Sequence, residues 1–562
     1  MKKFFNYKFL LLMVVVLAAF LRFYQLGINP PSLTWDEAAW GYNAYSLGID
    51  GKDEFGRFLP FNYLESFGDF KPPMYAYLDI IPVKLFGLNE FATRFPSALF
   101  GVLTVLLTFF LVKRIFRENH KPARNASISV AGGSLIINHK SEKIALLSAL
   151  FLAISPWHIL LSRAAFEANV ASFFIITGVW AFLAGAQDKK WYLIISSVSF
   201  ALSMYVFNTS RIVSPLLVLI LIILFRKKLW ELKKQTVTAF IIGLVVFLPI
   251  LGFLLTPQAG LRFKEVNIFS DPQVIKTANQ EIANDGNALW SKVIHNRRLL
   301  YSVEYIKHYF DNLSPNFLFI KGDGNPKFSI QTVGQMYIWD IIFFVGGILF
   351  LIRKREGNWW LIPLWLLIGI IPAATARETP HALRIETTLP TFQIVVAYGF
   401  VVLMDKITKY KKFIVYGLLF ILFLNFLYFY RNYFNHYPYE YSGEWQYGYK
   451  QSIEYVKSVE KSYDYIQVTN ALGRPYIYYL FYTKTNPEFF RQTASVERDS
   501  FGFITVKGFG KYVFPKNYDY SLSKNNKVLY INTPYNLPKN IKIQKTFYLL
   551  NGQPVLVAYT YD

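Results

Sequence analysis

Long apolar runs recur along the first three quarters of the chain, and short polar or basic stretches separate them. A helix needs about 20 mostly apolar residues to cross roughly 30 Å of hydrocarbon. We therefore predict about eleven membrane-spanning helices, at 9–26, 94–112, 144–160, 168–186, 191–208, 211–225, 237–255, 336–352, 359–376, 389–405 and 413–430. The first run is expected to stay as a signal anchor, because no small-x-small cleavage site follows it. The pattern predicts a polytopic α-helical membrane protein.

The apolar stretch 72–87 suggests a further span, yet it carries Asp79, Pro82 and Lys84. The positive-inside rule decides between the two interpretations. If this stretch does not cross, the basic clusters all face the cytoplasm; they are the amino-terminal lysines, 113–143, 189–190, 226–228, 353–355 and 406–412. We therefore predict an interfacial helix at 72–87 that lies along the lipid headgroups.

This orientation places several polar segments on the extracytoplasmic face of the plasma membrane. They are the first outer loop 27–93 with its interfacial helices, the turn 162–167, the loop 256–335 and the turn 377–384. These polar islands could converge on one site there. The spans and loops of residues 1–430 are then expected to form one transmembrane catalytic module.

The composition changes from about Arg431, where Tyr-rich alternating segments predict strands at 463–469 and 476–482. A helical pattern precedes them at 444–459, and Asn551-Gly552 between two apolar segments predicts a closing β-hairpin. We expect 431–562 to form a soluble α/β domain of ordinary size. An odd number of spans places this domain outside, beside the proposed site.

The overall composition supports the membrane class, because 53% of the residues are hydrophobic and only 17% are charged. Cysteine is absent, which excludes disulfides, thiolate nucleophiles and thiol metal sites. The net charge of +23 could suggest nucleic acid, but the basic residues sit in short loops beside apolar segments. We expect them to contact anionic membrane lipids and predict no nucleic-acid partner.

Thr34-Trp-Asp36-Glu37 opens a predicted helix that runs toward Leu47. Thr34 is a suitable N-cap, and Glu37 stands where it would complete a capping box, so a structural role and a catalytic role both stay open for Glu37. Asp36 makes no required capping bond, and the helix dipole keeps its carboxylate ionised. The adjacent carboxylates diverge by roughly 100° on a helix and would not easily chelate one ion. Asp36 is therefore the candidate general base.

An aspartate base suits the transfer of a sugar from a lipid phosphate, because the departing phosphate is already a stable anion and needs cations rather than an acid. The candidate cations are Lys71, Arg163 and Arg384. Each has a structural alternative, since Lys71 could snorkel, Arg163 could pair with Glu167 and Arg384 could anchor a span. Asp69 could orient Lys71 or neutralise it.

His381 is a further supporting candidate for phosphate or metal, although no second histidine stands at ligand spacing from it. Asp53 and Glu54 are expected to shape a turn. Nothing in the sequence indicates a cofactor, no metal site is assigned, and a divalent metal requirement stays open.

The polar motifs together resemble one family. They are Pro31-Ser-Leu-Thr-Trp-Asp36-Glu37-Ala, Gly51-x-Asp53-x-Phe-Gly56, Lys71-Pro72-Pro73, Phe86-Gly87-x-Asn-Glu90 and Arg94-Phe-Pro96-Ser97-Ala-Leu-Phe-Gly101. The chain resembles the dolichyl-phosphate-mannose protein mannosyltransferase superfamily, which includes the bacterial aminoarabinose lipid A transferases and has the GT-C glycosyltransferase fold. The match is strongest over 30–115, continues through Ser162-Arg163-Ala-Ala-Phe-Glu167, and fades beyond about 210.

The resemblance implies a polyprenyl- or dolichyl-phosphate sugar donor and a glycan, lipid or protein acceptor. It also implies an acidic base in the first outer loop, where Asp36 occupies the place of the base and Glu37 is its acidic neighbour. The Lys-Pro-Pro lysine, which the family uses for donor phosphate, corresponds to Lys71. We therefore expect an inverting integral membrane glycosyltransferase.

Two other classes stay open from the residues alone. A transporter or flippase of lipid-linked glycans would carry ionisable residues inside its spans and often shows repeated halves, whereas here the charges cluster at one surface. A membrane-anchored binding protein that displays the carboxy-terminal domain would need only one span.

Overall fold

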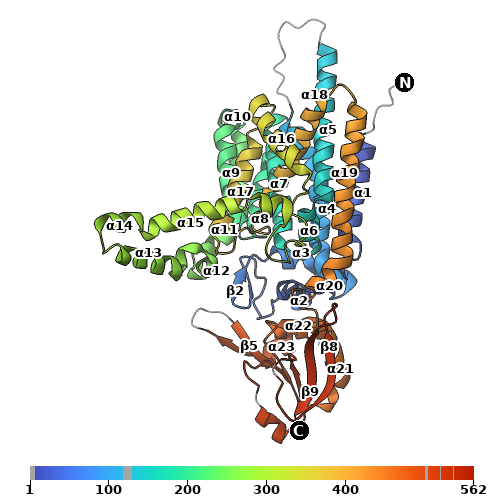
Figure 1. The fold of residues 1–562 in the computed structure, drawn as a ribbon, viewed down its shortest axis with the longest axis vertical. Coiled ribbons are helices and arrows are strands. Elements are labelled where there is room, and N and C mark those ends of the chain that lie inside the picture. The colour runs from blue at the N-terminus through green and yellow to red at the C-terminus, as the bar shows by residue number, and fades with distance from the viewer. Residues whose placement is uncertain (1–6, 118–129, 500–503, 519, 536, 562) are drawn as a thin grey trace. The chain divides into compact units, whose positions relative to one another are not determined.

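The computed structural model describes residues 7–117, 130–499, 504–518, 520–535 and 537–561. The chain divides into two compact units (Figure 1). The helical unit comprises Met1–Arg22, Leu99–Ser162 and Glu167–Phe429. The mixed unit comprises Phe23–Ala98, Arg163–Phe166 and Tyr430–Asp562, so the carboxy-terminal segment shares a unit with most of the predicted first outer loop.

Every predicted span coincides with helix. The helices are α1 (Tyr7–Phe23), α4 (Glu90–Ile115), α5 (Val130–Ile154), α6 (Pro156–Arg163), α7 (Glu167–Gln187), α8 (Tyr192–Met204), α9 (Ser210–Leu224), α11 (Lys233–Leu254), α16 (Asp340–Lys354), α17 (Leu361–Ala374), α18 (Thr391–Lys406) and α19 (Lys411–Arg431). Among the described residues, four helices are by themselves long and apolar enough to cross a membrane. The pair formed by α5 and α6 is bent by 56° at Ser155 and makes a fifth candidate.

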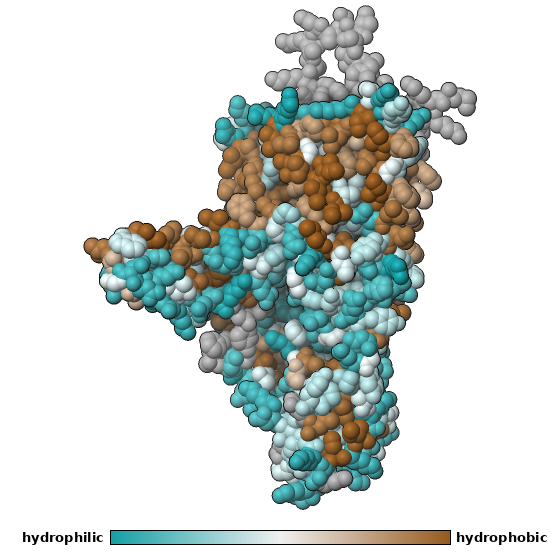
Figure 2. Space-filling view, in the orientation of Figure 1, coloured by the Kyte–Doolittle hydropathy of each residue, from teal (hydrophilic) through white to brown (hydrophobic). Residues whose placement is uncertain are grey.

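Close helix contacts hold the helical unit together, and small residues allow them. A Cβ atom on Gly399 of α18 would lie 2.0 Å from the carbonyl oxygen of Phe343 in α16, so these backbones touch where only glycine fits. On the outside, large apolar side chains such as Phe240 and Leu349 are exposed. Figure 2 shows a broad apolar surface over the helices of this unit. The chain is a polytopic membrane protein, as the sequence predicts.

Short helices connect the spans of the helical unit. They are α10 (Arg226–Glu231), η1 (Pro257–Gly260), α12 (Leu261–Val266), η2 (Ile268–Ser270), α13 (Pro272–Asn284), α14 (Leu289–Ile294), α15 (Arg297–Asp311), η3 (Asn316–Ile320) and η4 (Glu386–Thr388). In Figure 1, α13, α14 and α15 form a hairpin that projects from the rest of this unit. We call residues 272–311 the arm.

The mixed unit begins with α2 (Trp35–Asp50), β1 (Leu64–Ser66), β2 (Asp69–Lys71) and α3 (Met74–Phe86). The helix predicted at 72–87 is therefore present as α3, and its place at the headgroups stays a prediction. The carboxy-terminal helices are η5 (Asn432–His436), α20 (Tyr437–Tyr441), α21 (Tyr449–Val459), η6 (Glu460–Ser462), α22 (Pro475–Thr483), α23 (Pro487–Thr493) and η7 (Tyr520–Lys524).

A seven-stranded sheet forms the centre of the mixed unit, in the order β4-β5-β6-β3-β7-β9-β8. The strands are β3 (Tyr465–Val468), β4 (Ser495–Arg498), β5 (Ile504–Phe509), β6 (Tyr512–Val513), β7 (Val528–Asn532), β8 (Ile541–Tyr548) and β9 (Pro554–Tyr561). β3 runs parallel to β6 and β7, and the other described pairs are antiparallel. The predicted hairpin is confirmed as β8 and β9 around Gly552, whose φ is 84°.

The strand predicted at 476–482 is wrong, because these residues lie in α22. Pro475 takes the first helical turn, where its missing N–H costs nothing. The side chains from Tyr476 to Phe481 are all buried, so the helix is apolar all round and presents no amphipathic period. The aromatic-rich alternation came from a buried helix rather than from a strand.

Candidate functional site

The first turn of α2 places the two candidate carboxylates. The Thr34 backbone is extended, and its hydroxyl accepts a hydrogen bond from the Glu37 amide at 3.2 Å. In return, the Thr34 amide donates to Glu37 Oε2 at 2.9 Å. The predicted capping box is therefore confirmed, and α2 starts at Trp35, as its motif requires.

Glu37 lies at the centre of a buried hydrogen-bond network. Its Oε1 accepts from Arg94 Nε at 2.8 Å and from the Ala165 amide at 3.0 Å. Arg94 also donates to the carbonyl oxygens of Leu26 and Pro30. Both side chains of the Glu37–Arg94 pair are fully buried. The carboxylate binds several chain segments of the mixed unit together, and this arrangement favours a positioning role for Glu37.

Asp36 forms the second ion pair, with Lys71 at the end of β2. The side chain of Asp36 is 49% exposed and that of Lys71 is 11% exposed. The Lys71 ammonium lies 5.3 Å from the ring centre of Trp40 and 5.0 Å from that of Phe67. These contacts fix the ammonium and leave the carboxylate accessible. The structure thus brings together two predicted site residues that are 35 positions apart, the accessible carboxylate of Asp36 and the ring-flanked ammonium of Lys71.

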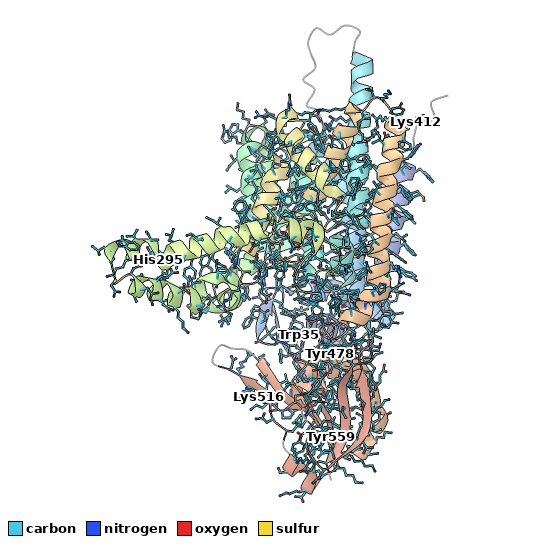
Figure 3. The ribbon with its side chains drawn as sticks, in the orientation of Figure 1. Trp35, His295, Lys412, Tyr478, Lys516 and Tyr559 are labelled. Carbon is cyan, nitrogen blue, oxygen red and sulfur yellow. The ribbon has the colours of Figure 1, made fainter. Side chains whose placement is uncertain are left out.

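Asp69 precedes Lys71 by two residues in β2, so both side chains leave the strand on the same face. Ser66 pairs with Asp69 across the antiparallel β1–β2 ladder. The two strands therefore set the position of the lysine relative to α2. The α2 and α22 helices also meet in this unit, and Figure 3 labels Trp35 at the start of α2 and Tyr478 in α22. Tyr478 Oη donates to the carbonyl of Leu33, just before α2, at 3.0 Å.

Arg163 is buried in the mixed unit and bonds within it. Its Nη2 donates to the Asn29 carbonyl at 2.8 Å, and its Nε donates to Tyr433 Oη at 3.1 Å. The guanidinium also lies 5.0 Å from the ring centre of Phe434. These bonds connect the start of the chain segment that holds Asp36 with the residues that follow α19.

A buried carboxyl that the sequence marks only as a turn residue lies within electrostatic reach of Lys71. Glu54 accepts from Ser66 Oγ at 3.0 Å and is completely buried. Burial raises the pKa of Glu54 to about 8, against a smaller opposing effect of the Lys71 charge. Its neighbour Asp53 does shape the predicted turn, because its Oδ1 accepts from the amides of Phe55 and Arg57.

The remaining predicted residues belong to the helical unit. Glu167 is the first residue of α7, and His381 and Arg384 lie in the turn between α17 and η4. The His381 amide donates to Asn312 Oδ1 at 3.0 Å, and its ring lies 5.0 Å from that of Phe328. Burial, with a smaller effect of Arg384, lowers the pKa of His381 well below its usual value. Convergence of this turn with Asp36 and Lys71 stays a prediction.

The turn also contains a carboxyl that the sequence did not single out. Glu386 in η4 is fully buried, and burial together with the nearby Glu167 raises its pKa well above the usual value. Nothing in its local sequence marks it, because its burial depends on packing between η4 and α7. In the part of the chain that the structure describes, no group of three or more acidic or histidine side chains could hold a metal ion.

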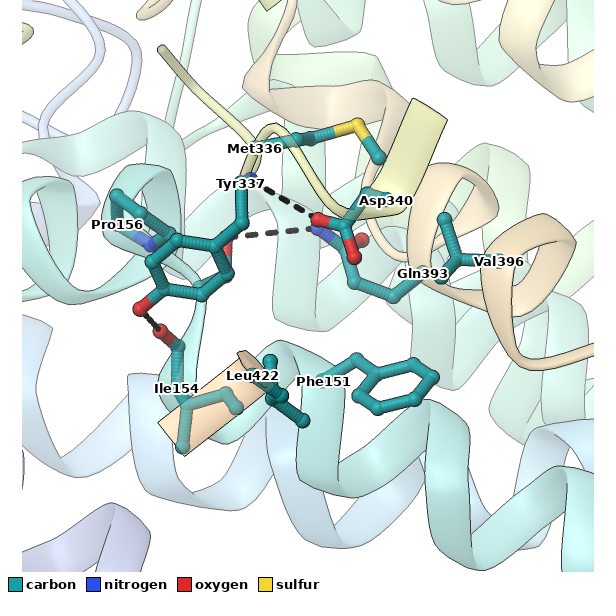
Figure 4. A pocket seen from close by; sticks show the side chains of 10 residues that line it. Phe151, Ile154, Pro156, Met336, Tyr337, Asp340, Gln393, Val396 and Leu422 are labelled. Atoms are coloured by element: carbon teal, nitrogen blue, oxygen red, sulfur yellow. Dashed lines mark hydrogen bonds between the residues drawn. The ribbon is translucent and has the colours of Figure 1, made fainter. Parts of the chain in front are cut away.

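A small cavity lies at the break between α5 and α6 in the helical unit (Figure 4). Asp340 Oδ2 accepts from the Tyr337 amide at 3.0 Å, and Tyr337 Oη donates to the Ile154 carbonyl at 2.6 Å. Gln393 and Ser155 supply further polar groups. The cavity contains none of the predicted site residues, and we do not assign it to the reaction.

Three comparisons with known proteins bear on this geometry. Residues 70–139 match the dolichyl-phosphate-mannose-protein mannosyltransferase family. An uncharacterized protein of Aquifex aeolicus (strain VF5) is 37% identical over 110 residues, which are 19% of this chain and 20% of that relative. The matched part therefore spans about a fifth of the curated relative.

Crystal structures of ArnT from Cupriavidus metallidurans match over nearly the whole chain. The apo structure has a TM-score of 0.53 at 11% identity and covers 98% of each chain. The structure bound to undecaprenyl phosphate has a TM-score of 0.54 at 11% identity and covers 97% of each chain. The chain has the fold of the GT-C glycosyltransferases. The predicted fold class is therefore confirmed, and the family match over residues 70–139 bears out the predicted superfamily resemblance.

Proposed function

We propose that this GT-C-fold protein is an integral membrane glycosyltransferase that moves a sugar from a polyprenyl-phosphate donor to an acceptor hydroxyl or amine. The reaction takes place on the extracytoplasmic face of the plasma membrane. The observation that carries this proposal is the Asp36–Lys71 pair, in which an accessible carboxylate stands beside a cation fixed by two aromatic rings. A base and a phosphate-binding cation are what this transfer requires.

The proposed step is a single inverting displacement. The acceptor oxygen or nitrogen forms a bond to the anomeric carbon while the bond from that carbon to the phosphate oxygen breaks. The acceptor proton passes to the Asp36 carboxylate, and the bonding electrons leave with the polyprenyl phosphate. Lys71 stabilises the phosphate charge, and it is released from Asp36 as the phosphate binds.

The donor class is supported by the matched family and by the shared fold. ArnT, which has a similar fold, binds undecaprenyl phosphate in one of its crystal structures. A lipid carrier would also explain why Asp36 and Lys71 occur in a chain whose other unit is built of membrane helices. We expect Arg384 to add positive charge at the phosphate, with His381 and Glu167 supporting that turn.

The buried Glu37–Arg94 pair positions the base rather than contacting the substrate. Glu37 fixes the start of α2, and Asp36 is the preceding residue. Arg163 and Asp69 act in the same way, since Arg163 holds the Asn29 segment and Asp69 stands on the strand of Lys71. Asp36 and Lys71 are thus the groups proposed to touch the reacting molecules.

The test compares wild type with Asp36→Asn after purification and reconstitution with a polyprenyl-phosphate sugar. A cell-envelope extract supplies the acceptor, and release of polyprenyl phosphate is measured, because that product is the same whichever acceptor takes the sugar. Asp50→Asn is the matched control, since it removes a carboxylate from the other end of α2. Asp36→Asn should abolish release while Asp50→Asn retains it, and equal release by wild type and Asp36→Asn would remove Asp36 from the mechanism.

A second experiment identifies the class of acceptor in cells. Mass analysis of envelope glycans, lipids and proteins from strains with and without the gene should reveal one modified class. Complementation with Asp36→Asn should fail to restore that modification. Full restoration by this variant would contradict the proposed base.

A further inference from the structure

The arm of the helical unit has two layers of opposite character. α13 directs Val274, Ile275 and Ala278 toward α15 and exposes polar residues on its other side. α15 is fixed on its inner face, where Tyr301 Oη donates to the Asp271 carbonyl at 3.1 Å and His308 Nδ1 to the Ala376 carbonyl at 2.8 Å. The polar side of the arm therefore belongs to α13.

The outer face of α15 is apolar, although no other part of the described chain buries it. Leu299, Val303, Ile306 and Phe310 follow one another at helical spacing and are 46%, 56%, 54% and 63% exposed. A helix packed on one side normally exposes polar residues on the other. Here a stripe of four large apolar side chains takes their place.

α14 extends this stripe toward the tip of the arm. Leu289, Trp290, Val293 and Ile294 are 81%, 57%, 72% and 51% exposed. We call the exposed apolar residues of α14 and α15 the lipid face. Monomeric proteins in water rarely expose a contiguous apolar surface of this kind, and such a surface marks a contact with a membrane or a partner.

The lipid face continues the apolar surface of the membrane helices. Tyr309 Oη of α15 donates to the Leu367 carbonyl of α17 at 2.7 Å, and the Leu367 side chain is itself 44% exposed. In Figure 2 the arm is brown along the edge turned toward the apolar surface of the spanning helices and teal along the opposite edge. A bilayer that surrounds these helices therefore also contacts the lipid face of the arm.

The charge of the arm is nearly balanced. Lys276, Lys292, Arg297, Arg298 and Lys307 oppose Glu281, Asp285, Glu304 and Asp311, which gives a formal charge of +1. Electrostatic attraction to anionic lipid is thus a minor contribution, and apolar burial provides the affinity.

We propose that the arm lies in the membrane interface, with the lipid face among the acyl chains and α13 in water. The base of the arm is bonded to the turn that contains His381, because Thr379 Oγ1 donates to the His308 carbonyl and the His381 amide donates to Asn312 Oδ1. The lipid face therefore sets the depth of the His381–Arg384 turn relative to the bilayer surface. This last consequence rests on the proposed function, whereas the membrane contact does not.

The absence of cysteine makes the test direct. Val303→Cys on the lipid face and Thr277→Cys on the exposed side of α13 are labelled with a nitrobenzoxadiazole fluorophore. Each full-length protein is reconstituted into phosphatidylcholine vesicles with and without lipids that carry a nitroxide on the acyl chain. We expect strong quenching at position 303 and at least threefold weaker quenching at position 277.

Equal, weak quenching at both positions would overturn the proposal. A label at 303 that is shielded from nitroxide lipids and depends on the protein-to-lipid ratio would also overturn it, since it would show a second copy as the partner. Quenching at 303 should stay unchanged in 1 M NaCl, and its loss in salt would contradict apolar insertion. Ile306→Glu should reduce the quenching, and Ser302→Glu beside the stripe is its matched control.

Discussion

Two adjacent carboxylates at the start of α2 have opposite environments. Glu37 and Arg94 are both fully buried, and each oxygen of Glu37 accepts a hydrogen bond from the surrounding chain. Asp36 is about half exposed, and Lys71 is its cation. The two side chains diverge because neighbouring residues on a helix point about 100° apart.

This difference in exposure assigns a structural role to one carboxylate of the motif and a chemical role to the other. A buried ion pair contributes little net stability when intact, but it is costly to break, because the remaining charge has no solvent. A pair whose carboxylate is half exposed is less costly to break, because that carboxylate stays solvated, and it can exchange partners with a ligand. Glu37 is therefore suited to positioning, and Asp36 is suited to accepting a proton.

The strongest way to break the comparison is Arg94→Met. The change leaves the Glu37 carboxylate buried without its cation, and we expect the free energy of unfolding to fall by about 3–5 kcal/mol. Thermal unfolding of the purified protein measures this loss. Lys71→Met is the control from the open pair. It leaves the half-exposed Asp36 carboxylate solvated, so the free energy of unfolding should fall by less than in Arg94→Met.

A double variant decides whether the buried charge is the cause. Glu37→Gln combined with Arg94→Met removes both charges and should recover part of the lost stability. If the double variant is less stable than Arg94→Met alone, the loss reflects packing around Arg94 and the charge argument is wrong.

Asp36→Glu sharpens the other side of the comparison. The charge is kept, but the carboxylate moves outward by about one bond length, and a displacement near 1 Å can reduce a rate by about 10²-fold. We expect kcat for donor turnover to fall by about that factor while the melting temperature stays unchanged. A variant as active as wild type would show that Asp36 provides charge alone.

Lys71→Ala tests the cation of the open pair. We expect the affinity for a polyprenyl phosphate to weaken about tenfold, which corresponds to about 1.4 kcal/mol. Direct binding of the lipid phosphate to the purified protein measures this effect apart from turnover. Lys52→Ala removes an exposed lysine from the same segment and should leave binding unchanged.

The hydrogen bonds between residues close in sequence could be predicted for this site, and the ion-pair partners of its carboxylates could not. The capping box of Thr34 and Glu37 depends on residues three positions apart, so the motif alone predicts it. The partner of Glu37 is Arg94, 57 positions later, and the partner of Asp36 is Lys71, 35 positions later. Only the folded chain decides which cation meets which carboxylate.

The fold shows the same limit. Hydropathy located the apolar helices because length and apolarity are local properties. Tyr-rich alternation predicted a strand where α22 lies, since a fully buried helix has no amphipathic period. The period of α15 was present in the sequence at 299, 303, 306 and 310, but its meaning depends on which face packs against the protein, and that is a tertiary property.

Glu54 provides the test with the smallest expected effect, because it is a second carboxyl that the Lys71 charge influences, beside Asp36. Burial holds its pKa near 8 in the folded protein, whereas the unfolded chain deprotonates near the ordinary value of 4.5. Between these values the folded state binds one more proton, so the free energy of unfolding decreases as the pH rises. The slope from this group is at most about 1.4 kcal/mol per pH unit. Glu54→Gln removes this pH dependence. From pH 6 to pH 7, the free energy of unfolding of the variant should therefore rise by about 1 kcal/mol relative to that of wild type, as measured by thermal unfolding. Parallel curves for the two proteins would mean that Glu54 is ionised in the folded state and that Lys71 neutralises two carboxylates rather than one.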